Sequence, residues 1–215
     1  MSNLRIEIMG AMGCGKTTLA KGFAALGVET HYEKVEQNPY LGTFYGNPPK
    51  FAFEKDMFFL IDFLHQAKKS SQDRIPTLFD YSLWGSLAYL KAGPQKDETK
   101  QLCERVVEAA FSQIGQPALI IYLDCPPEEL AKRIASRARS IEENVPLDYL
   151  RTLKAEMDKQ VGVAETATRV VTIKSAEADL RDPALGREWA QKVLQLIAQP
   201  TLLKRALPYR HLSQA

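Results

Sequence analysis

The stretch Gly10-Ala11-Met12-Gly13-Cys14-Gly15-Lys16-Thr17-Thr18 decides how this chain folds. It fits the pattern G-x-x-x-x-G-K-T of a phosphate-binding loop, whose backbone N–H groups turn inward around the phosphates of a nucleotide. In such a loop the lysine, here Lys16, reaches the terminal phosphates, and the hydroxyl that follows it, here on Thr17, ligates Mg²⁺. We therefore predict that residues 10–18 bind ATP as a phosphate donor.

The segments on either side of this loop support the prediction. Residues 4–8 alternate between apolar and polar side chains, which predicts a strand, and a helix from about Gly15 carries the apolar residues Leu19, Phe23 and Leu26. The amino-terminal end of that helix adds its positive dipole to the phosphate site. A pattern of four fixed positions also arises by chance, but a chance match has no reason to lie between a strand and an amphipathic helix.

The composition is that of an ordinary globular protein with a small-molecule partner. The 215 residues suffice for one sizeable core, so we expect a single domain over residues 1–215. Lysine and arginine together number 28, and aspartate and glutamate together number 26. This near balance gives no reason to expect a nucleic-acid polymer or an anionic membrane as partner.

The cysteines and the first residues indicate a cytoplasmic protein. Cys14, Cys103 and Cys125 are scattered without metal-like spacing, and residues 1–5 lead into a strand instead of a signal segment. No apolar run approaches the roughly 18 residues that span a membrane. We therefore expect a reducing, cytoplasmic environment.

Strand and helix patterns alternate along the rest of the chain. Residues 40–49 form a turn-rich segment. About five strands and about five helices in alternation predict an α/β fold with a parallel sheet covered on both faces, and the nucleotide then lies at the carboxyl ends of the strands. The patterns predict further strands at about 28–32, 74–80, 117–124 and 169–173, and helices at about 51–69, 83–90, 99–114, 130–139, 146–157 and 189–197.

Two carboxylates end predicted strands and are candidates for the chemistry of phosphoryl transfer. Asp80 can ligate Mg²⁺ together with Thr17, and the alternative is that Asp80 caps the helix that follows it. Glu33 can accept a proton from a hydroxyl group, although by itself it also fits a surface acid. We predict that both lie at the nucleotide-binding edge of the sheet.

Three arginines lie on and just after the helix at 130–139. Arg133 and Arg137 share a helix face, and Arg139 follows where the helix gives way. The planar guanidinium suits phosphate oxygens, so we predict an arginine lid over about residues 137–146 that closes on the donor and excludes water. Without the phosphate-binding loop, an exposed basic face would be the better interpretation.

The motifs along the chain occur in a distinctive order. After the phosphate-binding loop come Tyr32-Glu33-Lys34-Val35-Glu36-Gln37-Asn38-Pro39-Tyr40-Leu41, Phe44-Tyr45, Asp80-Tyr81-Ser82, Tyr122-Leu123-Asp124-Cys125-Pro126-Pro127-Glu128, Arg133-Ile134-Ala135-Ser136-Arg137-Ala138-Arg139 and Val145-Pro146-Leu147-Asp148-Tyr149-Leu150. This order resembles the deoxyribonucleoside kinase family, above all the bacterial deoxyadenosine and deoxyguanosine kinases. The resemblance spans about Arg5 to Gly162 and implies a P-loop kinase fold.

The resemblance also implies roles for individual residues. Glu33 matches the carboxylate that acts as base toward the 5′-hydroxyl of the acceptor. Tyr45 and Glu142 match residues that contact the 3′-hydroxyl of the sugar, and the three arginines named above match the arginines of the lid. Members of the family are commonly homodimers packed through long helices, a role that suits residues 51–69.

The sequence departs from the family pattern in two places. Tyr81 stands where the family has an arginine near the reacting phosphate, and losing a guanidinium costs several kcal/mol of transition-state stabilisation unless another cation replaces it. Asp56 stands where a glutamine reads the base, with Phe63 and Ser86 where an arginine and an aspartate are often paired. An ionised carboxylate only accepts hydrogen bonds, so Asp56 either binds the two adjacent donors of guanine or faces solvent.

The expected activity is ATP- and Mg²⁺-dependent transfer of a phosphoryl group to the 5′-hydroxyl of a deoxyribonucleoside, a purine such as deoxyguanosine or deoxyadenosine, in nucleotide salvage. A nucleoside monophosphate kinase shares the loop, sheet and lid but needs further cations near the acceptor, and Phe63 and Tyr81 argue against these. A non-catalytic relative that binds nucleotides is favoured by Tyr81 and opposed by the intact loop, Glu33 and the lid.

Overall fold

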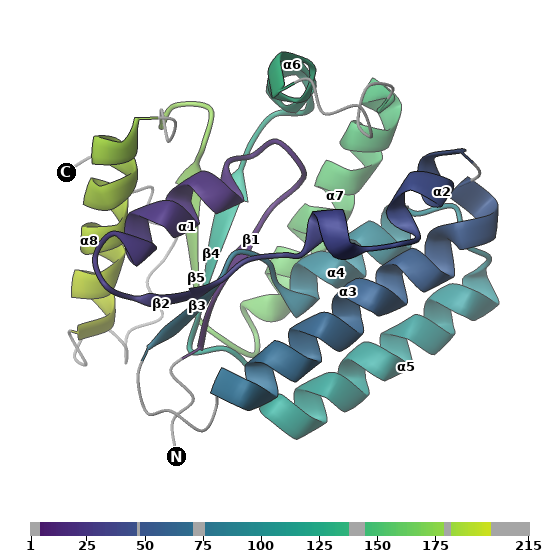
Figure 1. The fold of residues 1–215 in the computed structure, drawn as a ribbon, viewed down its shortest axis with the longest axis horizontal. Coiled ribbons are helices and arrows are strands. Elements are labelled where there is room, and N and C mark those ends of the chain that lie inside the picture. Colours follow the sequence, from purple (N-terminus) through teal and green to yellow (C-terminus); the bar gives the residue numbers. More distant parts are fainter. Residues whose placement is uncertain (1–4, 47, 71–75, 138–144, 179–181, 199–215) are drawn as a thin grey trace.

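Parallel strands form one sheet in the order β2-β3-β1-β4-β5 (Figure 1). The computed structural model of the chain describes residues 5–46, 48–70, 76–137, 145–178 and 182–198. All neighbouring strands run parallel, so their carboxyl ends meet at one edge of the sheet, and the predicted five-stranded parallel sheet is confirmed. The strands are β1 (Arg5–Met9), β2 (Glu29–His31), β3 (Thr77–Phe79), β4 (Leu119–Asp124) and β5 (Val170–Lys174).

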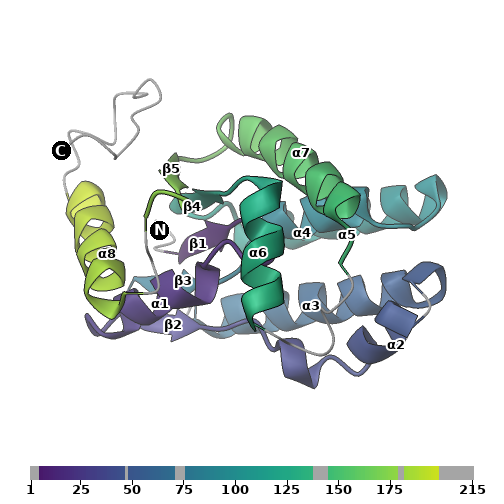
Figure 2. The ribbon, with the colours of Figure 1, turned by 90° about the horizontal axis from the view of Figure 1, so that it is seen from above.

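Helices cover both faces of the sheet, as Figure 1 and Figure 2 show. On one face α1 (Lys16–Ala24) packs against α8 (Pro183–Ala198). On the other face lie α3 (Pro48–Ser70), α4 (Leu83–Ala92), α5 (Asp97–Ile114) and α7 (Leu147–Ala164). Beyond the carboxyl ends of the strands lies α6 (Pro127–Arg137), and the 3-10 helix η1 (Val35–Gln37) and α2 (Leu41–Gly46) follow β2.

The central strand β1 is buried along its whole length, including its two charged residues. Arg5 Nε lies 2.7 Å from Glu7 Oε1, and the guanidinium also donates to the carbonyl oxygens of Ile114 and Gly115 at the end of α5. Burying a charge is costly unless it is paired and hydrogen-bonded, and both conditions hold here. The polar positions of the predicted alternation are therefore part of the core, and Arg5 links β1 to the end of α5.

The turn-rich segment predicted at 40–49 is wrong in part, because α2 begins at Leu41 and α3 begins at Pro48. The entry to α2 is built by Asn38, whose amide accepts from the N–H of Tyr40 and donates to the carbonyl oxygen of Lys55 in α3. Such a short helix shows no apolar repeat in the sequence, and α3 stabilises it by direct packing.

The described residues contain more helices than simple alternation predicts. Two successive α-helices lie between β2 and β3, between β3 and β4, and between β4 and β5. The second helix of each pair lengthens the layer on the α3 face without adding a strand.

Among the described residues, no helix combines the length and the apolar character needed to cross a membrane.

Candidate active site

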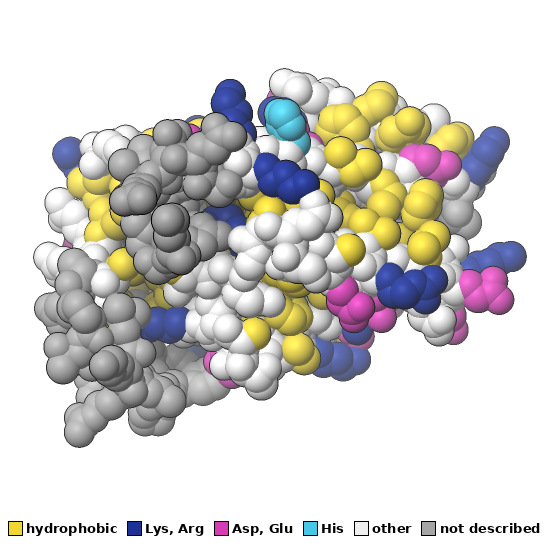
Figure 3. Space-filling model, turned by 90° about the horizontal axis from the view of Figure 1, so that it is seen from below, with side chains coloured by type: hydrophobic (Ala, Val, Ile, Leu, Met, Phe, Trp, Pro, Cys, Tyr) yellow, Lys and Arg dark blue, Asp and Glu magenta, His cyan; other side chains and the backbone are white. Residues whose placement is uncertain are grey.

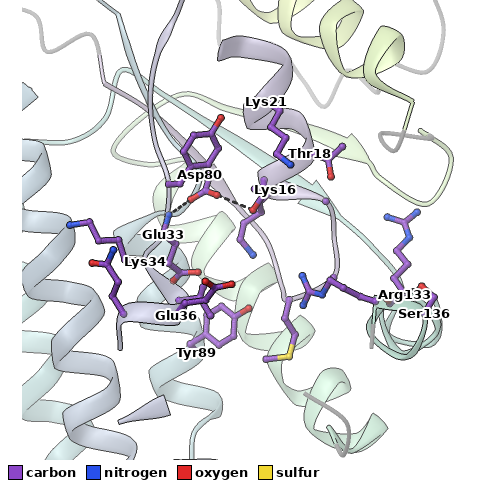
Figure 4. Close-up of a pocket in the computed structure, with 18 residues that line it drawn as sticks. Lys16, Thr18, Lys21, Glu33, Lys34, Glu36, Asp80, Tyr89, Arg133 and Ser136 are labelled. Carbon is purple, nitrogen blue, oxygen red and sulfur yellow. Dashed lines mark hydrogen bonds between the residues drawn. The ribbon is translucent and has the colours of Figure 1, made fainter. Parts of the chain in front are cut away.

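A cavity of about 740 Å³ opens at the carboxyl edge of the sheet (Figure 4). It is bounded by the phosphate-binding loop, the segment after β2, the end of β3, and helices α4 and α6. Its volume lies in the range of small-molecule sites. The lining residues are Met12, Gly13, Gly15, Lys16, Thr17, Thr18, Lys21, Tyr32, Glu33, Lys34, Val35, Glu36, Gln37, Asp80, Tyr89, Arg133, Ser136 and Arg137.

The phosphate-binding loop has the backbone geometry that its glycines predict. Gly13 and Gly15 adopt φ values of 81° and 103°, which side chains other than hydrogen rarely allow. Gly10 lets the loop pass close to β4, since a Cβ on it would lie 3.0 Å from the carbonyl oxygen of Leu123. Cys14 is buried beneath the loop, and burial raises the pKa of its thiol, which keeps it protonated.

The side chain of Lys16 folds back onto the phosphate-binding loop. Its ammonium donates to the carbonyl oxygens of Gly10 and Ala11 at 2.9 and 3.2 Å. Lys21 follows Thr17 by one helical turn and also lines the cavity, where Figure 4 shows it beside Thr18. The sequence interpretation missed Lys21, although its spacing from Thr17 was a usable signal.

The side chain of Asp80 joins two other segments of the site, through the side chain of Thr17 and the backbone of Glu33. The hydroxyl of Thr17 donates to Oδ2 of Asp80 at 2.9 Å, and the backbone N–H of Glu33 donates to Oδ1 at 2.6 Å. The helix that follows is capped at Ser82 rather than at Asp80, so the alternative role of Asp80 as a helix cap is wrong. The predicted convergence of two strand ends on the phosphate-binding loop is observed.

Asp80 suits a divalent cation because it is a buried carboxylate. Burial raises its pKa, while the N–H of Glu33, the hydroxyl of Thr17 and the charge of Lys16 act in the opposite direction. A nearby cation favours the charged form of a buried carboxylate. A carboxylate together with a hydroxyl also provides the oxygen ligands that Mg²⁺ prefers. The residues present therefore fit the predicted metal.

Glu33 shares its end of the cavity with two residues that the sequence interpretation missed. Figure 4 shows the side chains of Glu33, Glu36 and Tyr89 gathered on the side of the cavity toward which Lys16 points. Glu36 lies in the 3-10 helix η1, which begins two residues after Glu33. Tyr89 comes from α4, and no local sequence signal marks it.

The predicted lid is described in part. Arg133 and Arg137 both line the cavity from α6, as predicted. Arg133 Nε donates to Glu129 and its NH2 group donates to the carbonyl oxygen of Ser175, both at 2.8 Å. Arg139 and Glu142 lie outside the described residues.

Of the predicted sugar- and base-binding residues, the structure describes the side chain of Asp56, which lies outside the cavity lining. Tyr45 belongs to α2, and its side chain lies outside the described part of the chain. Asp56 does not belong to the residues that line the cavity. Its carboxylate pairs with Lys55 at 2.6 Å and accepts a hydrogen bond from Gln95. Phe63 is fully buried and packs against Phe79 and Tyr81.

Tyr81 follows Asp80 but is directed toward α3. Its hydroxyl accepts from Gln66 at 3.0 Å and lies 3.4 Å from the carboxylate of Asp62. Burial, followed by the negative charge of Asp62, raises the pKa of the Tyr81 hydroxyl far above its ordinary value, so it stays neutral. Tyr81, which departs from the family pattern, is thus packed and hydrogen-bonded in the structure.

Known proteins resemble this chain in sequence and in fold. Deoxyguanosine kinase of Bacillus subtilis is 25% identical over 193 residues, which are 87% of this chain and 93% of that protein. Deoxyadenosine kinase of Dictyostelium discoideum is 31% identical over 161 residues, 71% of this chain and 64% of that protein. The structure of a deoxyadenosine kinase from M. mycoides with products dCMP and a flexible dCDP bound has a TM-score of 0.75 at 21% identity, covering 89% of this chain and 99% of that one.

A family model matches almost the whole described chain. The model is described as deoxynucleoside kinase and covers residues 6–197, from the first strand to the last helix. The match includes the phosphate-binding loop, Glu33, Asp80 and the arginines of α6. The chain therefore belongs to the deoxynucleoside kinase family, whose enzymes transfer a phosphoryl group to a deoxynucleoside.

Proposed function

We propose that this enzyme uses ATP and Mg²⁺ to phosphorylate the 5′-hydroxyl of a purine deoxyribonucleoside in cytoplasmic nucleotide salvage. The observation that carries the proposal is the link from Thr17 through Asp80 to the backbone of Glu33, which joins the donor loop to the candidate base. Phosphoryl transfer requires charge neutralisation, an acceptor held in line and a group that takes its proton. The cavity holds candidates for charge neutralisation and for proton acceptance.

The donor side is assigned to the loop and the start of α1. The loop N–H groups and Lys16 bind the terminal phosphates, and Thr17 with Asp80 would hold Mg²⁺. Mg²⁺ supplies neutralisation of phosphate charge when it is bound. Arg133 and Arg137 approach the same space from α6, and we propose that a lid over about residues 137–146 closes there with Arg139.

The acceptor side is assigned to the segment after β2. Glu33 would accept the proton of the 5′-hydroxyl, and its backbone is fixed to Asp80 so that its side chain faces the cavity. Tyr45 and Glu142 remain predicted contacts to the 3′-hydroxyl of the sugar. The proposal is supported by the position of Glu33 on the side of the cavity toward which Lys16 points, since transfer in a single step requires the proton acceptor close to the donor phosphates.

A purine acceptor is supported by the two relatives described above, which are named deoxyguanosine kinase and deoxyadenosine kinase. For Asp56, guanine recognition stays a prediction, since Lys55 and Gln95 already occupy its carboxylate oxygens. A base that used Asp56 would have to displace or share these partners. Titrations with deoxyguanosine and deoxyadenosine test this, and equal affinity for adenine would contradict the assignment to Asp56.

A second copy of this chain is the proposed protein partner. Phe53 and Ile61 of α3 and Leu102 and Val106 of α5 are exposed, with Ile61 at 64%. Figure 3 shows hydrophobic side chains gathered on the side of the molecule where α3 and α5 lie. Two such helices pairing with their copies would bury this surface, in line with the homodimer expected for the family.

The test is turnover with ATP and Mg²⁺ on a panel of deoxyribonucleosides, ribonucleosides and their monophosphates. We expect turnover of a purine deoxyribonucleoside that is lost in Lys16→Ala and Glu33→Gln. Turnover of monophosphates alone would assign the chain to nucleoside monophosphate kinases. Binding of ATP without any turnover would support a non-catalytic relative, for which the replacement at Tyr81 is the specific observation.

A further inference from the structure

Lys34, the residue after Glu33, forms an ion pair with α3. Its Nζ lies 2.6 Å from Oδ1 of Asp62, and the two side chains are 37% and 14% exposed. Lys34 lines the cavity, but Figure 4 shows its side chain running away from Lys16. The ammonium is therefore directed at α3 and away from the donor phosphates.

Asp62 is held by two further side chains. Gln66, one helical turn along α3, donates to Oδ2 of Asp62 and also donates to the hydroxyl of Tyr81 at 3.0 Å. The ring of Tyr81 packs edge-on against Phe63 with centroids 5.0 Å apart, and Phe63 is fully buried. The carboxylate of Asp62 is thus held in place, because Gln66 and Tyr81 are themselves buried in the core.

Glu33 consequently lies between two fixed points. Its own backbone N–H donates to Asp80 at 2.6 Å, and the next side chain is tied to Asp62. Asp80 belongs to the end of β3 and Asp62 to α3, so the two attachments come from different elements. A short connection held at two points has few conformations left, which is how a reactive group is kept in place.

We infer that Lys34 and Asp62 are positioning residues for the phosphoryl transfer proposed above, and that their ion pair, braced by Gln66 and Tyr81, fixes the candidate base Glu33 in its reactive orientation. This inference rests on the proposed function. It also gives Tyr81 a role, because its neutral hydroxyl, which accepts from Gln66 and lies 3.4 Å from Asp62, leaves the charge of Asp62 to Lys34. Tyr81 then supports the positioning of Glu33.

The experiment compares Lys34→Met, Lys34→Arg and Asp62→Asn with the wild-type chain. We expect Lys34→Met and Asp62→Asn to lower kcat by about 10- to 100-fold, with KM for ATP and Tm little changed. Lys34→Arg keeps the charge and is expected to retain most of kcat. The double variant Lys34→Met with Asp62→Asn should have a kcat no lower than that of the less active single variant, because both changes break the same interaction.

Lys192→Met is the matched control. Lys192 pairs with Glu188 on α8 at 2.9 Å, and its side chain is 37% exposed, the same as Lys34. This control is expected to leave kcat unchanged. An equal loss of kcat in the control would overturn the inference, because any surface ion pair would then have the same effect.

Hydrogen exchange of the Glu33 amide supplies a readout that does not depend on turnover. We expect this amide to exchange faster in Lys34→Met and Asp62→Asn than in the wild-type chain and in Lys192→Met. A loss of kcat without faster exchange, or faster exchange with kcat within twofold of an active wild type, would overturn the inference. If the wild-type chain phosphorylates no deoxynucleoside, the proposed function fails, and unchanged exchange would then refute the anchoring of Glu33 by itself.

Discussion

The hydroxyl of Thr17 donates a hydrogen bond to Oδ2 of Asp80 across 2.9 Å, which joins the first turn of α1 to the end of β3. The two residues are 63 positions apart in the chain, and they meet because β1 and β3 are neighbours in the sheet. The contact brings a hydroxyl and a buried carboxylate to the edge of the phosphate-binding loop, and these two groups would hold the Mg²⁺ of the proposed reaction.

Asp80→Asn is expected to lower kcat by about 100-fold or more, because the negative charge that would hold Mg²⁺ is lost. Stability should not suffer, since burial raises the pKa of Asp80, so that ionising this carboxyl costs more free energy in the folded chain than in the unfolded chain. Steady-state kinetics and thermal unfolding measure the two effects. A variant that unfolds at much lower temperature would instead make Asp80 a structural residue.

Lys16→Met is expected to weaken ATP binding by about 10- to 100-fold, because a charged hydrogen-bond donor to phosphate is removed. Lys159→Met is the control, since Lys159 is 67% exposed on α7 and pairs with Glu156. Calorimetric titration with ATP gives both affinities. Equal affinity for Lys16→Met and the wild-type chain would contradict the assignment of residues 10–18 as the donor loop.

Gly22→Ala is expected to destabilise the fold by about 1–3 kcal/mol through overpacking. A Cβ on Gly22 would clash with the carbonyl oxygen of Gly186, where α1 packs against α8. The control is Gly162→Ala in α7, where a Cβ meets nothing within 4 Å and should stabilise the helix by about 0.5–1 kcal/mol. Urea unfolding measures the free energy of unfolding of both variants. Equal values for the two variants would show that α1 and α8 can move apart to accommodate the added methyl group.

Unfolding is expected to become easier as the pH rises above about 9. Burial raises the pKa of Cys103 from 9.0 to about 11, so between these values the folded chain keeps a proton that the unfolded chain loses. Each such group lowers the free energy of unfolding by at most about 1.4 kcal/mol per pH unit. Burial also raises the pKa of Tyr122, which extends the effect to higher pH.

Cys103→Ala tests the source of this pH dependence. Urea unfolding at a series of pH values from 8 to 11 should show a shallower decline for the variant than for the wild-type chain. The absolute stability of the variant is expected to be lower at every pH, because a buried side chain is shortened. Parallel curves would mean that Cys103 ionises equally in both states.

Leu102→Asp is expected to turn a dimer into a monomer without loss of secondary structure. Leu102 is 44% exposed on α5, within the proposed contact surface, and a buried carboxylate at a dimer interface is strongly unfavourable. Val163→Asp on α7, where Val163 is 49% exposed, is the matched control outside that surface. Light scattering at micromolar concentration measures the mass, and a monomeric wild-type chain would contradict the proposed dimer.

Sequence patterns predicted the sheet and the donor side of the cavity because these depend on local signals. Residues 10–18 carry a motif whose backbone geometry follows from its glycines, and the apolar run of β4 identifies a strand buried on both faces. Strand ends in a parallel sheet meet at one edge, so Glu33 and Asp80 could be placed near Thr17 without coordinates.

The acceptor side was harder to predict because it depends on contacts between distant elements. Tyr89 reaches the cavity from the interior of α4, and Asp62 meets Lys34 from α3, 28 residues away. Neither contact has a signature in the local sequence. The sequence also gave no indication that the Asp56 carboxylate has Lys55 and Gln95 as partners, since this depends on how the segment after α4 packs against α3.

The most direct test of the proposed activity is identification of the product formed from ATP, Mg²⁺ and deoxyguanosine or deoxyadenosine. Phosphorus NMR distinguishes a deoxynucleoside 5′-monophosphate from free phosphate. We predict one equivalent of the 5′-monophosphate per ADP with the wild-type chain and none with Glu33→Gln. Release of free phosphate without a 5′-monophosphate, or equal product yield from Glu33→Gln, would contradict the assignment of Glu33 as the base of a deoxynucleoside kinase.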